Sequence, residues 1–167
     1  MRAIRRAARI VVIAGCALVL GAPSSLAAGR ATAGSFQIED HYIDTGSSDV
    51  CGFPVQIDLH GIIRYEVRFD ANGDAVALVL HVIRSGTASG NGVTLTEFDR
   101  DTQLIDLVAG TTREVGIVFR ISVPGGTAVV FDRGMILVDG DGNFVQVSGP
   151  HPALDGDFEQ FCAALGA

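Results

Sequence analysis

Residues 55–69, VQIDLHGIIRYEVRF, alternate between apolar and polar side chains over almost their whole length. A period of two is typical of an antiparallel β-strand that has one face on a core and the other in water. A strand this long needs neighbouring strands along its length, so the stretch predicts a β-sheet protein. The apolar positions are Val55, Ile57, Leu59, Ile63, Tyr65, Val67 and Phe69.

Turn-forming residues separate further segments with strand patterns. An Asn-Gly turn at residues 70–74, a Pro-Gly-Gly turn at 124–126 and an Asp-Gly turn at 139–142 predict hairpin connections. Residues 85–92, rich in Gly and Ser, predict a flexible loop, residues 99–101 a polar turn, and residues 132–134 a break in a strand. The predicted strands are 36–43, 55–69, 76–84, 93–98, 102–108, 113–123, 127–138 and 143–148.

Short connections between about eight consecutive strands favour an all-β, up-and-down antiparallel order. Eight such strands can close into a barrel, lipocalin-like or allene-oxide-cyclase-like in architecture, and a β-sandwich is the alternative. At the C-terminal end, Phe158, Phe161, Cys162 and Leu165 have helical spacing, which predicts a short helix over residues 154–165 with Asp155 or Asp157 as its cap. We therefore expect one domain over residues 36–167.

The first residues have the pattern of a secretory signal peptide. A basic start is followed by an apolar run over residues 10–20, too short to span a bilayer, and by small residues that suit cleavage after Ala27. The pattern predicts a signal peptide over 1–27, a disordered segment over 28–35 and a secreted, extracellular protein. Residues 13–16 also resemble a lipobox, so a lipid anchor on Cys16 is the alternative.

Two cysteines, Cys51 and Cys162, follow the predicted signal peptide. In an oxidising compartment, a pair near opposite ends of a domain predicts one disulfide. The alternative is a reactive or metal-binding thiol pair, but neither cysteine has a His or Cys neighbour at ligand spacing.

The sequence contains 12 Arg, no Lys and 19 acidic residues. Four of the arginines lie in residues 1–27, so the chain after cleavage carries 8 Arg against 19 acidic residues, a net charge of −11. Such a surface repels nucleic acid and anionic lipid, which excludes both as expected partners. A small apolar ligand or a cell-envelope component is compatible with it.

Three short motifs carry a family resemblance: residues 49–55 (DVCGFPV), 133–143 (RGMILVDGDGN) and 154–165 (LDGDFEQFCAAL). They resemble a pattern in a functionally uncharacterised family of secreted actinobacterial β-rich, barrel-like proteins, over most of residues 50–165. The resemblance implies a secreted β-rich domain with a terminal disulfide, and it implies no activity.

The sequence Asp44-Thr45-Gly46 has the form of a pepsin-like aspartic protease loop. Such a site needs two of these loops sharing a proton, and the sequence holds no second Asp-Thr-Gly or Asp-Ser-Gly. We interpret the stretch as a turn before a strand.

Other motifs assign no catalytic residue, metal or cofactor. The acidic turn at residues 139–143 begins like a calcium loop, but Phe144 and Pro150 stand where an EF-hand needs Gly and Glu. The four histidines are not paired at metal-ligand spacing. The sequence contains neither a nucleophile elbow nor a phosphate loop.

Tyr65 and His81 are the polar groups that would line an open barrel interior. The large side chains along residues 55–69 favour a filled interior instead. We therefore expect a non-enzymatic structural or interaction barrel of the cell envelope or extracellular space. An extracellular barrel that binds a small apolar ligand, and a barrel enzyme without a strong motif, are the alternatives.

Overall fold

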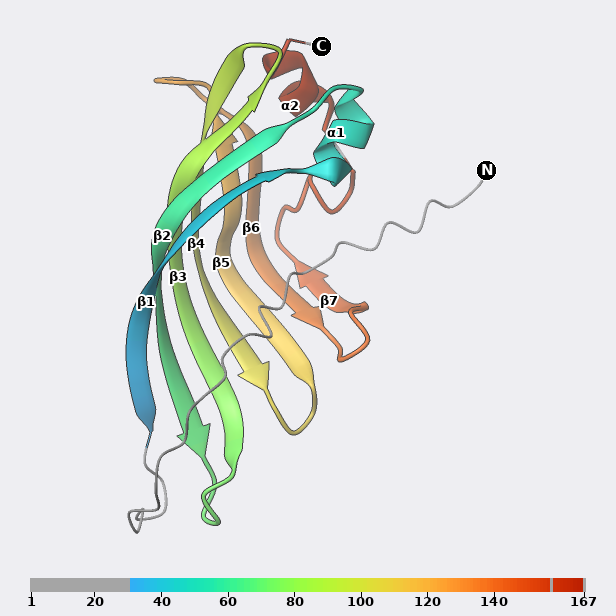
Figure 1. The fold of residues 1–167 in the computed structure, drawn as a ribbon. Helices are drawn as coiled ribbons and strands as arrows, with labels where there is room; N and C mark the ends of the chain where they lie inside the picture. Colours follow the sequence, from blue (N-terminus) through green and yellow to red (C-terminus); the bar gives the residue numbers. More distant parts are fainter. Residues whose placement is uncertain (1–30, 157, 167) are drawn as a thin grey trace.

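The computed structural model describes residues 31–156 and 158–166, which form a single antiparallel sheet and two short helices. The sheet has seven strands in the order β1 to β7, each paired with its neighbour in sequence (Figure 1). The up-and-down order is as predicted. In the described residues β1 and β7 are the two edges and do not pair with each other. The strands are β1 (Thr32–Ile43), β2 (Gln56–Phe69), β3 (Ala75–Gly90), β4 (Val93–Asp106), β5 (Thr111–Ser122), β6 (Ala128–Val138) and β7 (Phe144–Ser148), and the helices are α1 (Thr45–Cys51) and α2 (Glu159–Ala164).

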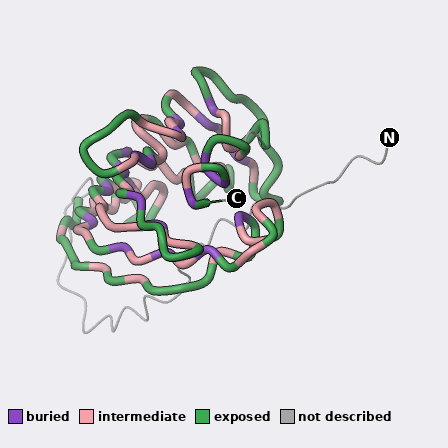
Figure 2. Tube along the Cα trace, turned by 90° about the horizontal axis from the view of Figure 1, so that it is seen from above, coloured by how far each residue is buried: buried purple, intermediate pink, exposed green. Residues whose placement is uncertain are grey.

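The sheet is strongly curved, and both helices lie at the same end of it (Figure 1). We call the face on which α2 packs the inner face, and the opposite face the outer face. The predicted alternation of β2 is confirmed, because Ile57, Leu59 and Ile63 are buried. In Figure 2 the buried positions along the strands are short stretches between less buried ones. The main core contains Val55, Ile57, Leu59, Ala88, Leu95, Ile121, Val130, Phe161, Cys162 and Leu165.

The predicted disulfide is confirmed. Cys51 ends α1, Cys162 lies in α2, and their Cα atoms are 5.1 Å apart. Helix α2 is shorter than predicted: it begins at Glu159 after Phe158, which makes no side-chain capping bond, so Asp155 does not cap it. Asp157 lies outside the described residues. The disulfide therefore holds the two helices together at one end of the sheet.

Three interruptions predicted from composition are wrong, and so is the count of about eight strands. Residues 85–90 belong to β3, residues 99–101 lie inside β4, and residues 132–134 lie inside β6. The first two segments pair with a strand on both sides, and residues 132–134 pair with β5 on one side. This pairing holds Gly, Ser and Asp in extended conformation despite their low strand propensity. Likewise, residues 32–35, expected to be disordered, pair with β2.

Helix α1 is absent from the sequence-based prediction. Asp44 is its N-cap: its Oδ1 accepts a hydrogen bond from Gly46 N at 3.0 Å, and its Oδ2 accepts one from Ser47 Oγ at 2.6 Å. A short acidic side chain before a helix commonly satisfies the free N–H groups of the first turn. The Asp-Thr-Gly sequence is thus a capped helix start, which corrects the interpretation of this stretch as a turn.

The predicted signal peptide and the alternative lipidation site, Cys16, lie outside the described residues. Among the residues that are described, neither helix has the length and apolar character needed to cross a membrane.

Replacing Cys51 and Cys162 together by Ser should lower the free energy of unfolding by about 4–5 kcal/mol, because the bond closes a loop of more than a hundred residues in the unfolded chain. Urea denaturation followed by circular dichroism measures the change. A reducing agent should destabilise the wild type and leave the double variant unaffected. Equal stability of the two proteins would contradict the prediction.

Asp44→Ala should lower the free energy of unfolding by about 1 kcal/mol through loss of the α1 cap. Asp44→Asn is the matched control, because Asn caps a helix as well as Asp and removes only the charge. The same denaturation assay compares the three proteins. An equal loss in both variants would show that the charge, and not the cap, stabilises this helix.

Candidate functional site

The structure places the two predicted ligand-lining residues on opposite faces of the sheet. Tyr65 pairs with Leu80 on the inner face, and its ring lies 6.3 Å from that of Phe36. His81 pairs with Arg64 on the outer face, where its Nδ1 lies 3.0 Å from Thr102 Oγ1. Because directly opposed side chains share one face, Tyr65 and His81 cannot line the same site.

Acidic side chains gather on the inner face beside the core. Strand β4 contributes Glu97, Asp99 and Asp101, three successive inward positions. Asp99 and Asp101 are 0% and 4% exposed, although charged residues are rarely buried without a partner. We call this set, completed by Glu114 on β5 and Asp132 on β6, the inner carboxyl cluster.

One arginine enters the inner carboxyl cluster. Arg84 on β3 is directly opposite Asp99, and its Nη2 lies 2.7 Å from Asp99 Oδ2. Burial by itself lowers the pKa of Arg84, but the neighbouring Asp99, Asp101 and Glu97 outweigh it and raise that pKa. The guanidinium is thus held as a cation among several carboxyl groups.

Burial raises the pKa values of the inner carboxyl cluster. It raises the pKa of Glu97 to about 8, with a further contribution from Asp99. The pKa of Asp99 rises only to about 6, because Arg84 favours its charged form. Desolvation disfavours the charged form of a carboxyl group, so part of the cluster is protonated near neutral pH.

Asp101 and Glu114 form a pair within the cluster. In the register of β4 and β5, Gln103 is opposite Glu114, which makes Asp101 the diagonal neighbour of Glu114. Burial raises the pKa of both groups, that of Asp101 to about 8, and each carboxyl group affects the pKa of the other. Neither oxygen of Asp101 has a hydrogen-bond partner among the described residues. Because two neighbouring buried carboxylates repel each other, the pair favours a state in which one of them is protonated.

Two glycines occupy the inner positions next to Asp101. Gly116 is opposite Asp101 and Gly134 is opposite Gly116, with φ of 140° and 133°. A Cβ at these positions would lie 2.5 Å from Arg100 O and 2.0 Å from Ser148 O, so no larger residue fits without a shift of the backbone. The strands therefore approach one another without side chains beside the Asp101 carboxyl group.

His151 lies on the β6–β7 side of the cluster. It is 3% exposed, and its Nε2 lies 3.2 Å from Ser148 O. Its Nδ1 has no hydrogen-bond partner in the part of the chain that the structure describes. The imidazole contributes to the electrostatic environment of Glu114 and Asp132, whose pKa values burial raises.

Aromatic and apolar side chains lie on the inner face around the cluster. Tyr42 and Phe36 on β1 are 48% and 42% exposed. Burial of its hydroxyl and the nearby Glu97 raise the pKa of Tyr42 to about 12, which places that phenol beside the cluster. On β3 and β4, Leu78 and Ile105 are opposite each other and only partly buried. The carboxyl groups thus adjoin an accessible apolar surface.

No family model, curated protein or solved structure matches the chain. The resemblance to secreted actinobacterial proteins accordingly stays a prediction. In the described residues, no group of three or more His, Cys, Asp and Glu side chains has an arrangement that could hold a metal ion. Buried carboxyl groups with raised pKa values, such as those of Glu97 and Asp101, can accept or donate protons near neutral pH.

The sequence contains one pattern that indicates this site. Every second residue after the buried Leu95 is polar and inward-facing: Glu97, Asp99, Asp101 and Gln103. Because Asp is depleted in strands, the segment was predicted as a turn. Only the pairing partners on β3 and β5 reveal that these residues face inward.

Raised carboxyl pKa values make the protein less stable as pH rises. The folded state keeps protons on carboxyl groups that the unfolded chain releases above the ordinary Asp pKa of 3.8. The stability that these bound protons contribute is therefore fully present below pH 3.8 and is lost by about pH 8. Each such proton corresponds to about 1.4 kcal/mol per pH unit. Asp101→Asn should therefore reduce the fall in the free energy of unfolding between about pH 5 and 8.

Urea denaturation at several pH values measures this slope. Asp74→Asn, which removes the same charge from the exposed turn before β3, should leave the slope unchanged. The interpretation is wrong if both variants change the slope equally.

Proposed function

We propose that the protein is an extracellular binding protein whose inner face holds a small molecule with an apolar body and a cationic group. The observation that supports this most is the inner carboxyl cluster, in which Glu97, Asp99, Asp101 and Glu114 surround the guanidinium of Arg84. A second cation near Asp101 and Glu114 would favour their ionised forms and balance the charge.

The cost of burying these groups argues against a purely structural role. Carboxyl groups taken out of water without full pairing destabilise a fold, and apolar side chains at the same positions stabilise it. Perturbed carboxyl groups of this kind cluster at functional sites. The cluster therefore favours ligand binding over the structural or interaction barrel expected from the sequence.

The surroundings of the cluster fit the two parts of such a ligand. Tyr42 and Phe36 offer accessible aromatic faces, and aromatic rings attract organic cations. Tyr65, Leu78 and Ile105 extend the inner face with apolar surface for the body of the ligand. In this proposal Tyr65 keeps its predicted role, and His81, on the outer face, does not contribute.

An incomplete barrel is the architecture we propose. Seven strands in one curved up-and-down sheet, with α2 packed against the inner face, are more compatible with a barrel than with a sandwich. In a sandwich, a second sheet would cover the core that α2 covers here.

An acid–base enzyme is a second candidate, and the Asp101–Glu114 pair is the observation that favours it. A carboxyl group that stays protonated near pH 8 can donate a proton to a bound substrate. Conversion of the captured molecule during incubation would distinguish this candidate from simple binding.

Decylamine should bind more tightly than decanol, which has the same chain length and no charge. Asp101→Asn should weaken the binding of decylamine about tenfold through loss of a charge-assisted contact. Binding should release protons and strengthen from about pH 5 to 8, because the cation favours ionised carboxyl groups. Calorimetry in two buffers of different ionisation enthalpy measures affinity and proton release together.

Asp74→Asn is the control for nonspecific attraction to an acidic protein and should bind decylamine like the wild type. The proposal fails if this variant and Asp101→Asn bind equally, or if decanol binds as tightly as decylamine. Native mass spectrometry and solvent extraction of protein purified from its own host then identify the natural ligand. A protein that is empty in that assay would favour the structural role.

A further inference from the structure

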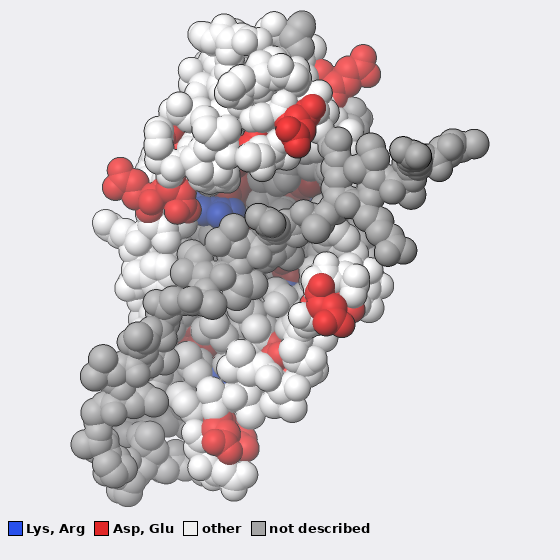
Figure 3. All heavy atoms as spheres, turned by 45° about the vertical axis from the view of Figure 1, so that its right-hand side comes forward, with Lys and Arg blue, Asp and Glu red and all other residues white. Residues whose placement is uncertain are grey.

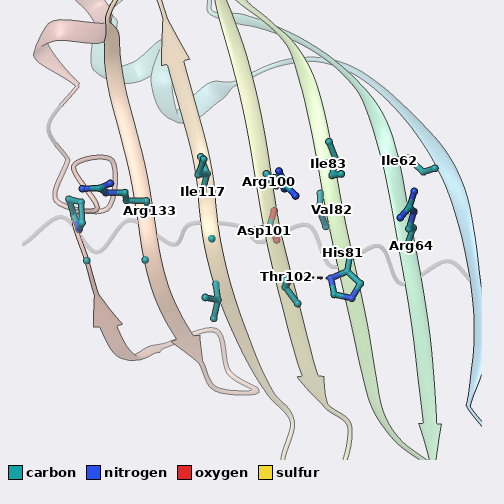
Figure 4. A pocket seen from close by; sticks show the side chains of 15 residues that line it. Ile62, Arg64, His81, Val82, Ile83, Arg100, Asp101, Thr102, Ile117 and Arg133 are labelled. Carbon is teal, nitrogen blue, oxygen red and sulfur yellow. Dashed lines mark hydrogen bonds between the residues drawn. The ribbon is translucent and has the colours of Figure 1, made fainter.

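The outer face carries a groove of about 800 Å³ that crosses β2 to β6. Figure 4 shows side chains from these strands projecting into it, among them Arg64, Arg100 and Arg133. None of these three arginines forms a salt bridge within residues 31–156 and 158–166. Three of the eight arginines that follow residue 27 thus gather at one place, where the nearly buried Asp101 is the acidic residue of the lining.

The strand register orders these side chains. One row across the outer face reads Ile62, Ile83, Arg100, Ile117 and Arg133, and the next includes Arg64, His81, Thr102 and Val115. Arg100 and Arg133 lie two strands apart, a separation of about 10 Å between their backbones. Isoleucine side chains lie between and beside the arginines, so the floor of the groove alternates between cationic and apolar.

Exposed apolar side chains accompany the arginines. Ile83 is 41% exposed and Val115 is 46% exposed, and both line the groove. His81 and Thr102 are hydrogen-bonded to each other at the same place and offer polar atoms to a ligand (Figure 4). A groove with these components matches a molecule that has both a hydrocarbon part and a negative group.

We propose that this outer groove binds a single anionic amphiphile, a hydrocarbon chain that ends in a carboxylate. Arg100 holds the carboxylate, since a guanidinium can donate two parallel hydrogen bonds to it, and Arg133 adds positive charge on the β7 side of the groove (Figure 4). The hydrocarbon chain lies over the isoleucine row. The volume lies within the usual range for a small-molecule site.

The charge of the whole protein favours a free molecule over a membrane as the source of this group. Figure 3 shows a face of the molecule with many acidic and few basic side chains, in agreement with the net negative charge. The net negative charge of the protein as a whole opposes the approach of an anionic bilayer, whereas one small anion meets only the groove. The sequence-based expectation that the protein does not bind anionic lipid surfaces is therefore compatible with a local site for one small anion.

Calorimetric titration with decanoate, decanol and inorganic phosphate tests the proposal. Decanoate should bind, and decanol and phosphate should each bind at least about tenfold more weakly, because decanol lacks the negative group and phosphate lacks the hydrocarbon chain. Arg100→Gln should weaken decanoate binding about tenfold, and Arg133→Gln, which removes only a nearby charge, should weaken it less. These residues are exposed, and a thermal unfolding scan confirms that the variants are folded.

Arg113→Gln is the matched control: it removes the same charge from β5, outside the groove, and should bind decanoate like the wild type. Glu97→Gln, in the inner carboxyl cluster and outside the lining of the groove, should also keep decanoate binding, which separates this site from the proposed inner site. Equal weakening by Arg113→Gln, tight binding of decanol, or no binding of decanoate would overturn the proposal. Binding to anionic vesicles without binding of monomeric decanoate would overturn it in favour of a membrane surface.

Discussion

The structure depends on covering one face of a single sheet. A lone curved sheet has no second layer, so its inward apolar residues need another element against them. Phe161 and Leu165 of the α2 region belong to one buried core with Leu59 and Ala88 of the sheet, and Cys51 anchors α2 through the disulfide. Because the linked residues are 111 positions apart, this bond joins α2 to the helix between β1 and β2.

The inner face changes character along its length. Near the helices it is a closed apolar core, and farther from them it becomes a set of carboxyl groups around Arg84. Low polarity from the core raises the pKa values of these carboxyl groups, and their mutual repulsion adds to this. The stability of the core thus offsets the cost of burying these ionisable side chains beside it.

Strand alternation also separates two chemically opposite surfaces. Successive residues of β4 point to opposite faces, so Asp99 and Asp101 join the inner cluster while Arg100 between them faces the outer groove. The run Asp99-Arg100-Asp101 is a polar turn by composition. In the sheet it supplies the acidic site on one side and the basic site on the other, although the three residues are adjacent in sequence.

Local sequence pattern by itself determined the long strand β2, the up-and-down order of the strands, three of the hairpin turns and the cysteine pair. These features depend on periodicity, on turn-forming residues and on the number of cysteines, which can all be seen in the sequence alone. The continuity of β3, β4 and β6, the capped helix after Asp44 and the inner carboxyl cluster were decided by tertiary structure. Strand pairing overrides the propensity of Gly, Ser and Asp, and burial depends on partners distant in sequence. The same applies to Tyr65 and His81, because only the register of β2 with β3 shows that the two side chains lie on opposite faces of the sheet.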